Sequence, residues 1–150
     1  MIRTACSYSI ARFLPYRDSG EFVNIGVLLA CPPRGLLLKR FEERQGGRIR
    51  GFFPALDMGV YHAVRAAAET ELERVGGNLA AAPGQTGVEE LSASCLHAFR
   101  QIVRPRESIL RFGETGVVMS DDPRATLEIL FRRYVEPAGP DGSDASEDSV

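Results

Sequence analysis

Apolar and polar side chains alternate along the first third of the chain, which is the pattern of β-strands. Residues 5–14 alternate, with Cys6, Tyr8, Ile10, Arg12 and Leu14 on one face, and a second, largely apolar segment over residues 21–31 follows the turn-forming segment 15–20. A period of two predicts strands, and a proline- and glycine-rich segment predicts a turn. Residues 36–40, three leucines followed by Lys39 and Arg40, predict a third strand after a further turn. We therefore expect an N-terminal antiparallel meander.

The first two strands carry an unusual pair of residues. Pairing through a six-residue loop predicts that Ile10 lies beside Ile25, and it places Asn24 and Gly26 together on the opposite face, with serines and alanines. Strand interiors disfavour asparagine and glycine. Two interpretations follow: a shallow docking face for a partner, with the Asn24 amide available for hydrogen bonds, or a face covered by this chain's own elements, with Gly26 at a bulge.

Arg12 falls on the apolar face of the same hairpin, and Glu21 begins the facing strand. A buried arginine must be paired, because an isolated charge is costly to desolvate. The sequence leaves two roles open for Arg12. It forms a structural ion pair with Glu21, Asp18 or a helix C-terminus, or it binds an anion.

Helical spacing dominates after residue 56. Asp57 is a good N-cap for a helix that we expect to end at Gly76, and Asp122 precedes a proline at the first position of the last helix. We expect helices over residues 57–75, 86–104 and 123–136, and extended segments over residues 49–53 and 107–120.

These elements predict one α+β domain over residues 1–136. Its N-terminal antiparallel sheet has three to five strands and is covered on one face by about three helices. Residues 137–150 are rich in Gly, Ser, Asp and Pro and lack apolar periodicity, so we expect a disordered acidic tail.

Composition places the chain among ordinary globular proteins, with 44% hydrophobic and 25% charged residues. Its longest apolar run is far shorter than the roughly 20 residues that a membrane span requires, and its first residues lack a signal-peptide pattern. We therefore expect a cytoplasmic protein without a membrane association. The three cysteines, Cys6, Cys31 and Cys95, lie far apart in apolar stretches, and we expect each to pack in the core as a small hydrophobe.

Candidate catalytic chemistry is sparse. His62 and His97 lack the spacing of a metal site, and the chain carries neither a nucleophile elbow nor a phosphate-binding loop. We therefore name no catalytic residue, metal or cofactor, and an enzyme with an unfamiliar site stays open, which would need a pocket in which charged groups converge.

Arginines gather in two stretches of the chain. The first set is Arg34, Lys39, Arg40, Arg44, Arg48 and Arg50, and the second is Arg100, Arg104, Arg106 and Arg111. If the two sets converge, their planar guanidinium groups could hold phosphates or a nucleic acid. The other interpretation is a solvated basic face, or a patch paired with the acidic tail.

Three strings of residues resemble a known family. They are YSIARFLP at residues 8–15, EFVNIG at residues 21–26 and DDP at residues 121–123. They resemble a bacterial family catalogued as domain of unknown function 3037, and the resemblance extends over most of residues 8–136. It implies a protein partner, because genes of this family often lie beside genes for kinases similar to the toxin kinases of bacterial persistence systems.

The leading hypothesis is therefore a non-enzymatic protein-interaction or accessory module, with a kinase-like protein encoded nearby as its partner. Binding would use the small-residue face of the hairpin or an edge strand. The alternative is a phosphate or nucleic-acid binding domain built on the two arginine sets. The candidate binding residues are Arg12, Glu21, Asn24, Gly26, Arg48, Arg104 and Arg106.

Overall fold

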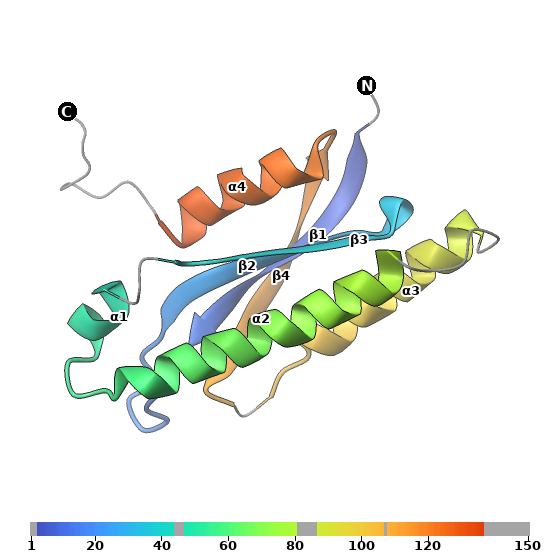
Figure 1. Ribbon diagram of the computed structural model, residues 1–150. Coiled ribbons are helices and arrows are strands. Elements are labelled where there is room, and N and C mark those ends of the chain that lie inside the picture. Colours follow the sequence, from blue (N-terminus) through green and yellow to red (C-terminus); the bar gives the residue numbers. More distant parts are fainter. Residues whose placement is uncertain (1–2, 44–46, 81–86, 107, 137–150) are drawn as a thin grey trace, which may run out of the picture.

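Four antiparallel strands and four helices make up the fold in the computed structural model, which describes residues 3–43, 47–80, 87–106 and 108–136 (Figure 1). The strands are β1 (Thr4–Phe13), β2 (Val23–Cys31), β3 (Leu36–Phe41) and β4 (Leu110–Ser120). The helices are α1 (Gly47–Phe52), α2 (Met58–Ala80), α3 (Val88–Val103) and α4 (Pro123–Tyr134), with a short 3-10 turn, η1 (Pro32–Arg34), between β2 and β3. The α+β class predicted from the sequence is confirmed. The predicted tail, residues 137–150, lies outside the described residues.

The strand order is β3-β2-β1-β4, with every neighbouring pair antiparallel. The first three strands form the predicted meander. The predicted extended segment after α3 becomes β4, which returns across the molecule and pairs with β1. Strands β3 and β4 are therefore the two edges of the sheet.

Helices cover both faces of the sheet, whereas we expected them on one face. Helices α2 and α3 lie on one side and α4 on the other (Figure 1). Every residue of β2 except Asn24 is buried, and a strand that is apolar on both faces needs cover on both. The consecutive apolar residues Val27, Leu28 and Leu29 supply this two-sided pattern, because Leu28 faces the α2 side while Val27 and Leu29 face α4. No helix among the described residues is both long and apolar enough to cross a bilayer.

The β1–β2 register differs from the predicted one by two residues. Ile10 lies opposite Val27 rather than Ile25. The connecting segment is longer than the six residues that we assumed, because Phe13 pairs with Val23 and residues 14–22 form the loop. Because side chains alternate with a period of two, an offset of two residues leaves each β1 side chain on its predicted face. The prediction of which β1 residues share a face is therefore unchanged.

A bulge in β2 changes the faces within that strand. Ala11 pairs with Gly26, but the next residue, Arg12, pairs with Asn24, so that Ile25 is an extra residue without a partner. An extra residue reverses the alternation of side chains from that point on. Asn24 and Gly26 therefore lie on opposite faces of the sheet, and the prediction that they share a face is wrong.

Two predicted elements in the middle of the chain are corrected. Residues 49–52 are helical rather than extended, and the Phe53 amide directly after the helix donates to the Ile49 carbonyl oxygen at 2.8 Å. Ile49 and Phe53 are both buried. Helix α2 continues through Gly76 and Gly77 instead of ending there. A side chain at Gly76 would meet the carbonyl oxygen of Leu37 at 3.1 Å, so the bare α-carbon lets α2 pass close to β3.

Cys6 and Cys31 form a disulfide between β1 and β2. The register places them directly opposite each other when it is extended by one pair, and their Cα atoms are 4.4 Å apart, the spacing of a non-hydrogen-bonded antiparallel pair. Both are buried against α4. Cys95 is free and buried, so the expectation of three unlinked core cysteines holds for this residue alone.

Candidate binding cleft

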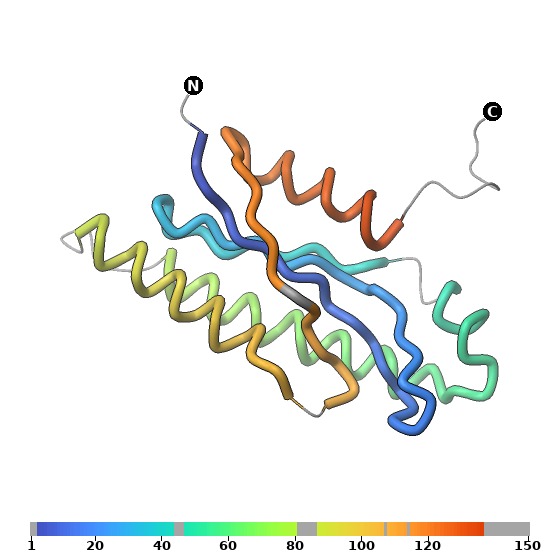
Figure 2. The backbone as a smooth tube through the Cα atoms, turned by 180° about the vertical axis from the view of Figure 1, so that it is seen from behind, coloured from blue at the N-terminus to red at the C-terminus, as the bar shows by residue number. Residues whose placement is uncertain are grey.

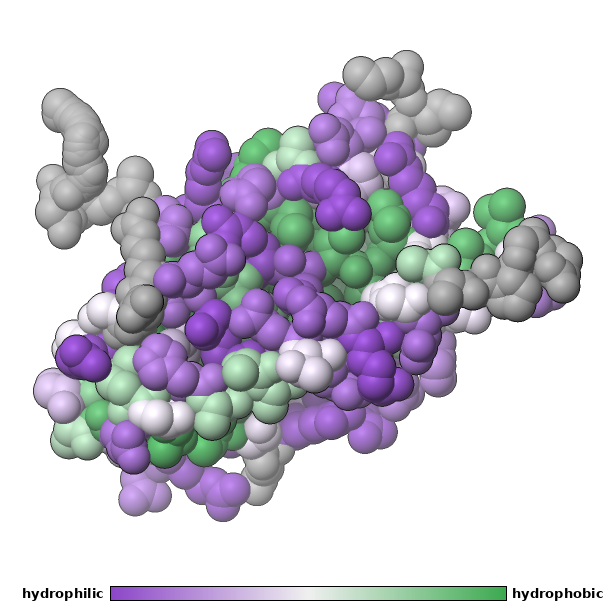
Figure 3. Space-filling view, in the orientation of Figure 1, coloured by the Kyte–Doolittle hydropathy of each residue, from purple (hydrophilic) through white to green (hydrophobic). Residues whose placement is uncertain are grey.

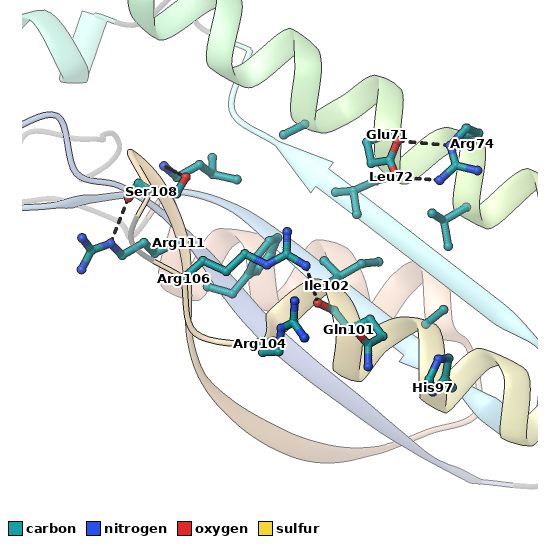
Figure 4. Close-up of a pocket in the computed structure, with 15 residues that line it drawn as sticks. Glu71, Leu72, Arg74, His97, Gln101, Ile102, Arg104, Arg106, Ser108 and Arg111 are labelled. Atoms are coloured by element: carbon teal, nitrogen blue, oxygen red, sulfur yellow. Dashed lines mark hydrogen bonds and ion pairs between the residues drawn. The ribbon is translucent and has the colours of Figure 1, made fainter.

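A cleft of about 480 Å³ opens between α2, α3 and the start of β4 (Figure 4). Its volume lies within the range of about 300–1,000 Å³ that is typical of ligand sites. Apolar side chains form the floor: Ala68, Leu72, Val75, Ala98, Ile102, Leu110 and Phe112. Polar side chains form the rim: Glu71, Arg74, His97, Gln101, Arg104, Arg106, Ser108 and Arg111.

The floor follows from the periodicity of the three elements. Leu72 and Val75 are three residues apart on α2, and Ala98 and Ile102 are four residues apart on α3, so each pair lies on one helix face. Together with alternate residues at the start of β4, they continue the core cluster that α2 and α3 form against the sheet. The cleft therefore leaves part of this core cluster accessible between the two helices and β4.

Two arginines from the end of α3 reach the rim. Arg106 donates a hydrogen bond of 3.1 Å to the carbonyl oxygen of Gln101, which belongs to the last turn of α3, where backbone acceptors lack helical partners. Arg104 has no hydrogen-bond or ion-pair partner among the described residues, and Figure 4 shows its side chain beside that of Arg106. No described side chain or carbonyl group therefore occupies its guanidinium donors.

The other two arginines of the rim are engaged. Arg74 donates two hydrogen bonds, of 3.1 and 2.6 Å, to the carboxylate of Glu71, and this contact lowers the pKa of Glu71 and raises that of Arg74. Arg111 donates to the carbonyl oxygen of Ser108 at 2.9 Å, and its guanidinium group points away from Arg104 in Figure 4. Glu71 is the only acidic residue on the described rim, so the α3 end of the cleft is positively charged.

The first arginine set does not join this cleft. Arg48 donates to the carbonyl oxygens of Val135, at the end of α4, and of Asn24, the latter at 3.3 Å. Arg40 donates to the Glu128 carboxylate on α4 at 2.7 Å. These contacts lie on the α4 side of the sheet, whereas the cleft lies on the α2 and α3 side. The premise of the phosphate and nucleic-acid alternative, that the two sets converge, is therefore not met by the described residues.

Arg12 packs on an aromatic ring and forms no ion pair with Glu21 or Asp18 among the described residues, and its anion-binding role stays a prediction. Its guanidinium carbon lies 4.4 Å from the centre of the Phe22 ring, and its side chain fills the space over Gly113, where a β-carbon would be 2.7 Å away. Its Nε is buried without a hydrogen-bond partner. Glu21 is exposed and forms no ion pair with Arg12 among the described contacts. Stacking on Phe22 replaces the predicted ion pair.

Asn24 and Gly26 are used within the fold. The Asn24 side chain donates a hydrogen bond of 2.9 Å to the carbonyl oxygen of Tyr134 in α4. A β-carbon at Gly26 would lie 2.8 Å from the Phe41 ring, so the glycine makes room for that ring. The small-residue face considered as a docking surface is thus occupied by this chain's own α4 on one side and by Phe41 on the other.

A buried polar pair lies at the far end of α2. The Tyr61 hydroxyl donates a hydrogen bond to the carboxylate of Glu42, and both residues are buried. Burial, together with this contact, raises the pKa of Tyr61. The pair does not line the cleft, and the residues that the structure describes contain no group of three potential metal ligands. Its geometry fits a structural role that joins α2 to the end of β3.

Comparison with known proteins identifies the family of this chain. A family model described as "Protein of unknown function (DUF3037)" matches residues 8–135, and this confirms the resemblance seen in the hairpin and in the start of the last helix. The searches of curated proteins and of solved structures gave no match.

Proposed function

Because this chain belongs to the DUF3037 family, whose function is unknown, we propose a function from its geometry: it is a protein-interaction module without catalytic activity of its own. The binding site is the cleft between α2, α3 and β4. The partner contributes an acidic segment that also carries an apolar side chain.

One observation carries this proposal: the same cleft is lined by apolar side chains and by Arg104, which has no partner among the described residues. Burying apolar surface on the floor contributes roughly 25 cal/mol per Å². A carboxylate beside it can accept a forked pair of hydrogen bonds from the free guanidinium group of Arg104. A ligand that satisfies both features combines an apolar group with an anion a few ångströms away.

Such a site suits a protein segment better than a nucleic acid. Nucleic-acid surfaces combine extended basic tracks with exposed aromatic rings on which bases stack. Here the floor is mostly aliphatic, with Phe112 as its one aromatic residue, and the basic group is confined to one end of the cleft. An amphipathic acidic segment laid between α2 and α3 matches this layout.

The gene neighbourhood implied by the family resemblance supplies the first partner to test. We expect the kinase-like product of an adjacent gene to bind this chain through the cleft. The test is co-purification of the two proteins, followed by titration calorimetry with the double variant Arg104→Glu and Arg106→Glu. Loss of the acid-to-arginine contacts should weaken binding by about tenfold or more.

The matched control reverses two exposed arginines on α4, Arg124 and Arg132, with the same substitutions. The control variant changes the net charge by the same amount but leaves the cleft intact. Its affinity for the kinase-like partner should therefore equal that of the wild type. Equal weakening in both variants would show non-specific electrostatic attraction and would overturn the assignment of the cleft.

A further inference from the structure

Strand β4 leaves one side unpaired. It hydrogen-bonds with β1 on one side, and no other described element lies against its outer edge. Figure 2 shows β4 passing in front of β1, and the strand order places no further strand beyond it among the described residues. An edge of this kind presents a row of free N–H and C=O groups that can pair with another strand.

The opposite edge strand, β3, carries charged side chains that form ion pairs with the neighbouring helices. Lys39 lies 3.4 and 3.2 Å from the carboxylates of Glu69 and Glu73 on α2, and Arg40 pairs with Glu128 on α4. Figure 3 shows hydrophilic residues over the left-hand part of the region between α4 and α2, and hydrophobic residues toward its right-hand end. Charged side chains on an edge oppose the approach of a second strand. Residues 115–120 of β4 contain neither a charge nor a proline.

The uncharged part of β4, residues 115–120, also exposes large apolar side chains. Val117 is 71% exposed and Met119 is 53% exposed. They are two residues apart and therefore share a face of the sheet, while Val118 between them points to the opposite face and packs in the cluster under α4. A strand edge that is neutral and apolar is a site for strand pairing.

The two ends of β4 carry opposite charges, which identifies the kind of strand that fits. Arg111 lies near the start, and Asp121 and Asp122 follow directly after the last residue. Strand β4 has an extra residue between Phe112 and Thr115, where its register with β1 shifts. If a second β4 runs antiparallel about a twofold axis at Val117, each Arg111, which lies beyond that shift, comes beside the acidic end of the other copy. A single twofold rotation therefore pairs the positively charged end of each β4 with the negatively charged end of the other, as in an isologous interface.

From this self-complementarity we infer that two copies of this chain associate through their β4 strands and form a continuous eight-stranded antiparallel sheet. Val117 lies against Val117 of the second copy, and Met119 lies against Thr115. Arg111 also lies on the rim of the cleft, with its side chain pointing away from Arg104 (Figure 4). Val117 does not line the cleft, so substitutions at Val117 test the pairing separately from the proposed function.

The experiment measures mass by sedimentation equilibrium for the full chain and two variants. The wild type should be a dimer, and Val117→Lys should be a monomer with an unchanged circular dichroism spectrum, because two lysines would meet at the axis. Val117→Cys should form a disulfide-linked dimer on mild oxidation. The matched control is Ile129→Cys, which places a thiol at an exposed site on α4 and should remain unlinked.

A charge exchange tests the two ends of the strand. Arg111→Asp should weaken dimerisation, and adding Asp121→Arg in the same chain should restore it, since each end then meets its complement again. A wild type that stays monomeric at high micromolar concentration would overturn the inference. A Val117→Lys variant that remains a dimer would overturn it too, because the interface would then lie elsewhere.

Discussion

The side-chain amide of Asn24 donates a hydrogen bond of 2.9 Å to the carbonyl oxygen of Tyr134 and thereby ties β2 to the end of α4. Tyr134 is the last residue of that helix, where carbonyl groups lack a partner within the helix. The contact explains why a polar residue interrupts an otherwise buried apolar strand. It also joins the two ends of the described chain, since β2 belongs to the N-terminal hairpin.

The first prediction concerns this hydrogen bond. Asn24→Leu should lower the free energy of unfolding by about 1–3 kcal/mol, because the Tyr134 carbonyl group loses its donor while it stays partly buried. Urea denaturation measures the change. The same substitution at Asn78, which is exposed on α2, should change stability by less than about 0.5 kcal/mol. An Asn24→Leu variant as stable as the wild type would show that the hydrogen bond is not needed.

The second prediction concerns the glycine beside the β2 bulge. Gly26→Ala should destabilise the protein by about 1–3 kcal/mol, because the new β-carbon would lie 2.8 Å from the Phe41 ring. Gly77→Ala is the matched control, since nothing lies within 4 Å of that position in α2. It should stabilise the helix by up to about 1 kcal/mol. Thermal unfolding of both variants measures the change in stability relative to the wild type. The same change in the two variants would contradict the packing described for Gly26.

The third prediction is a loss of stability at alkaline pH. Burial and the contact with Glu42 raise the pKa of Tyr61 in the folded chain, whereas an unfolded tyrosine ionises near pH 10. The unfolded state therefore releases this proton first, so the stabilising contribution is complete below about pH 10 and falls as the pH rises further. Unfolding curves between neutral and strongly alkaline pH measure this fall.

Tyr61→Phe separates this group from other titrating residues. The variant should be less stable than the wild type at neutral pH, because Glu42 loses a donor, but its stability should fall less steeply at alkaline pH. Burial also raises the pKa of Cys95 to about 11, and that contribution remains in the variant. If the free energy of unfolding falls equally steeply with alkaline pH in the wild type and in Tyr61→Phe, the role assigned to Tyr61 is refuted.

The fourth prediction concerns the cysteines. The oxidised, folded chain should not react with a thiol reagent, because Cys6 and Cys31 are joined and Cys95 is buried. After denaturation without a reductant it should show one thiol per chain. The disulfide closes a loop with a sequence separation of 25 residues, so its reduction should cost about 3 kcal/mol of stability. Three reactive thiols in the denatured, unreduced chain would rule out the linkage.

Much of the architecture could be read from local patterns. Alternation over residues 5–14 indicated β1, and the aspartate–proline pair at residues 122–123 indicated the start of α4, where the Asp122 carboxylate accepts from the Ala125 amide. These signals are local, because period and capping depend on neighbours in the chain. The second arginine set was also visible, and the structure places Arg104 and Arg106 in the cleft.

The features that sequence reasoning missed depend on contacts between distant segments. The bulge at Ile25 follows from the pairing of β2 with β1. It places the Asn24 side chain on the α4 side of the sheet, opposite Gly26. The Cys6–Cys31 pairing depends on the same register, which the sequence analysis placed two residues away. Arg74 belongs to the cleft only because α2 and α3 lie side by side, and residue spacing within one helix cannot show that.

The most direct test of the binding cleft uses anilinonaphthalene sulfonate, a dye that joins an apolar ring system to one anionic group. Titrated against the native chain, it should bind at a single site with enhanced, blue-shifted fluorescence. Arg104→Glu with Arg106→Glu should weaken that binding by about tenfold or more, while Arg124→Glu with Arg132→Glu should not. No fluorescence gain with the folded wild type, or superimposable titrations for all three proteins, would contradict the account.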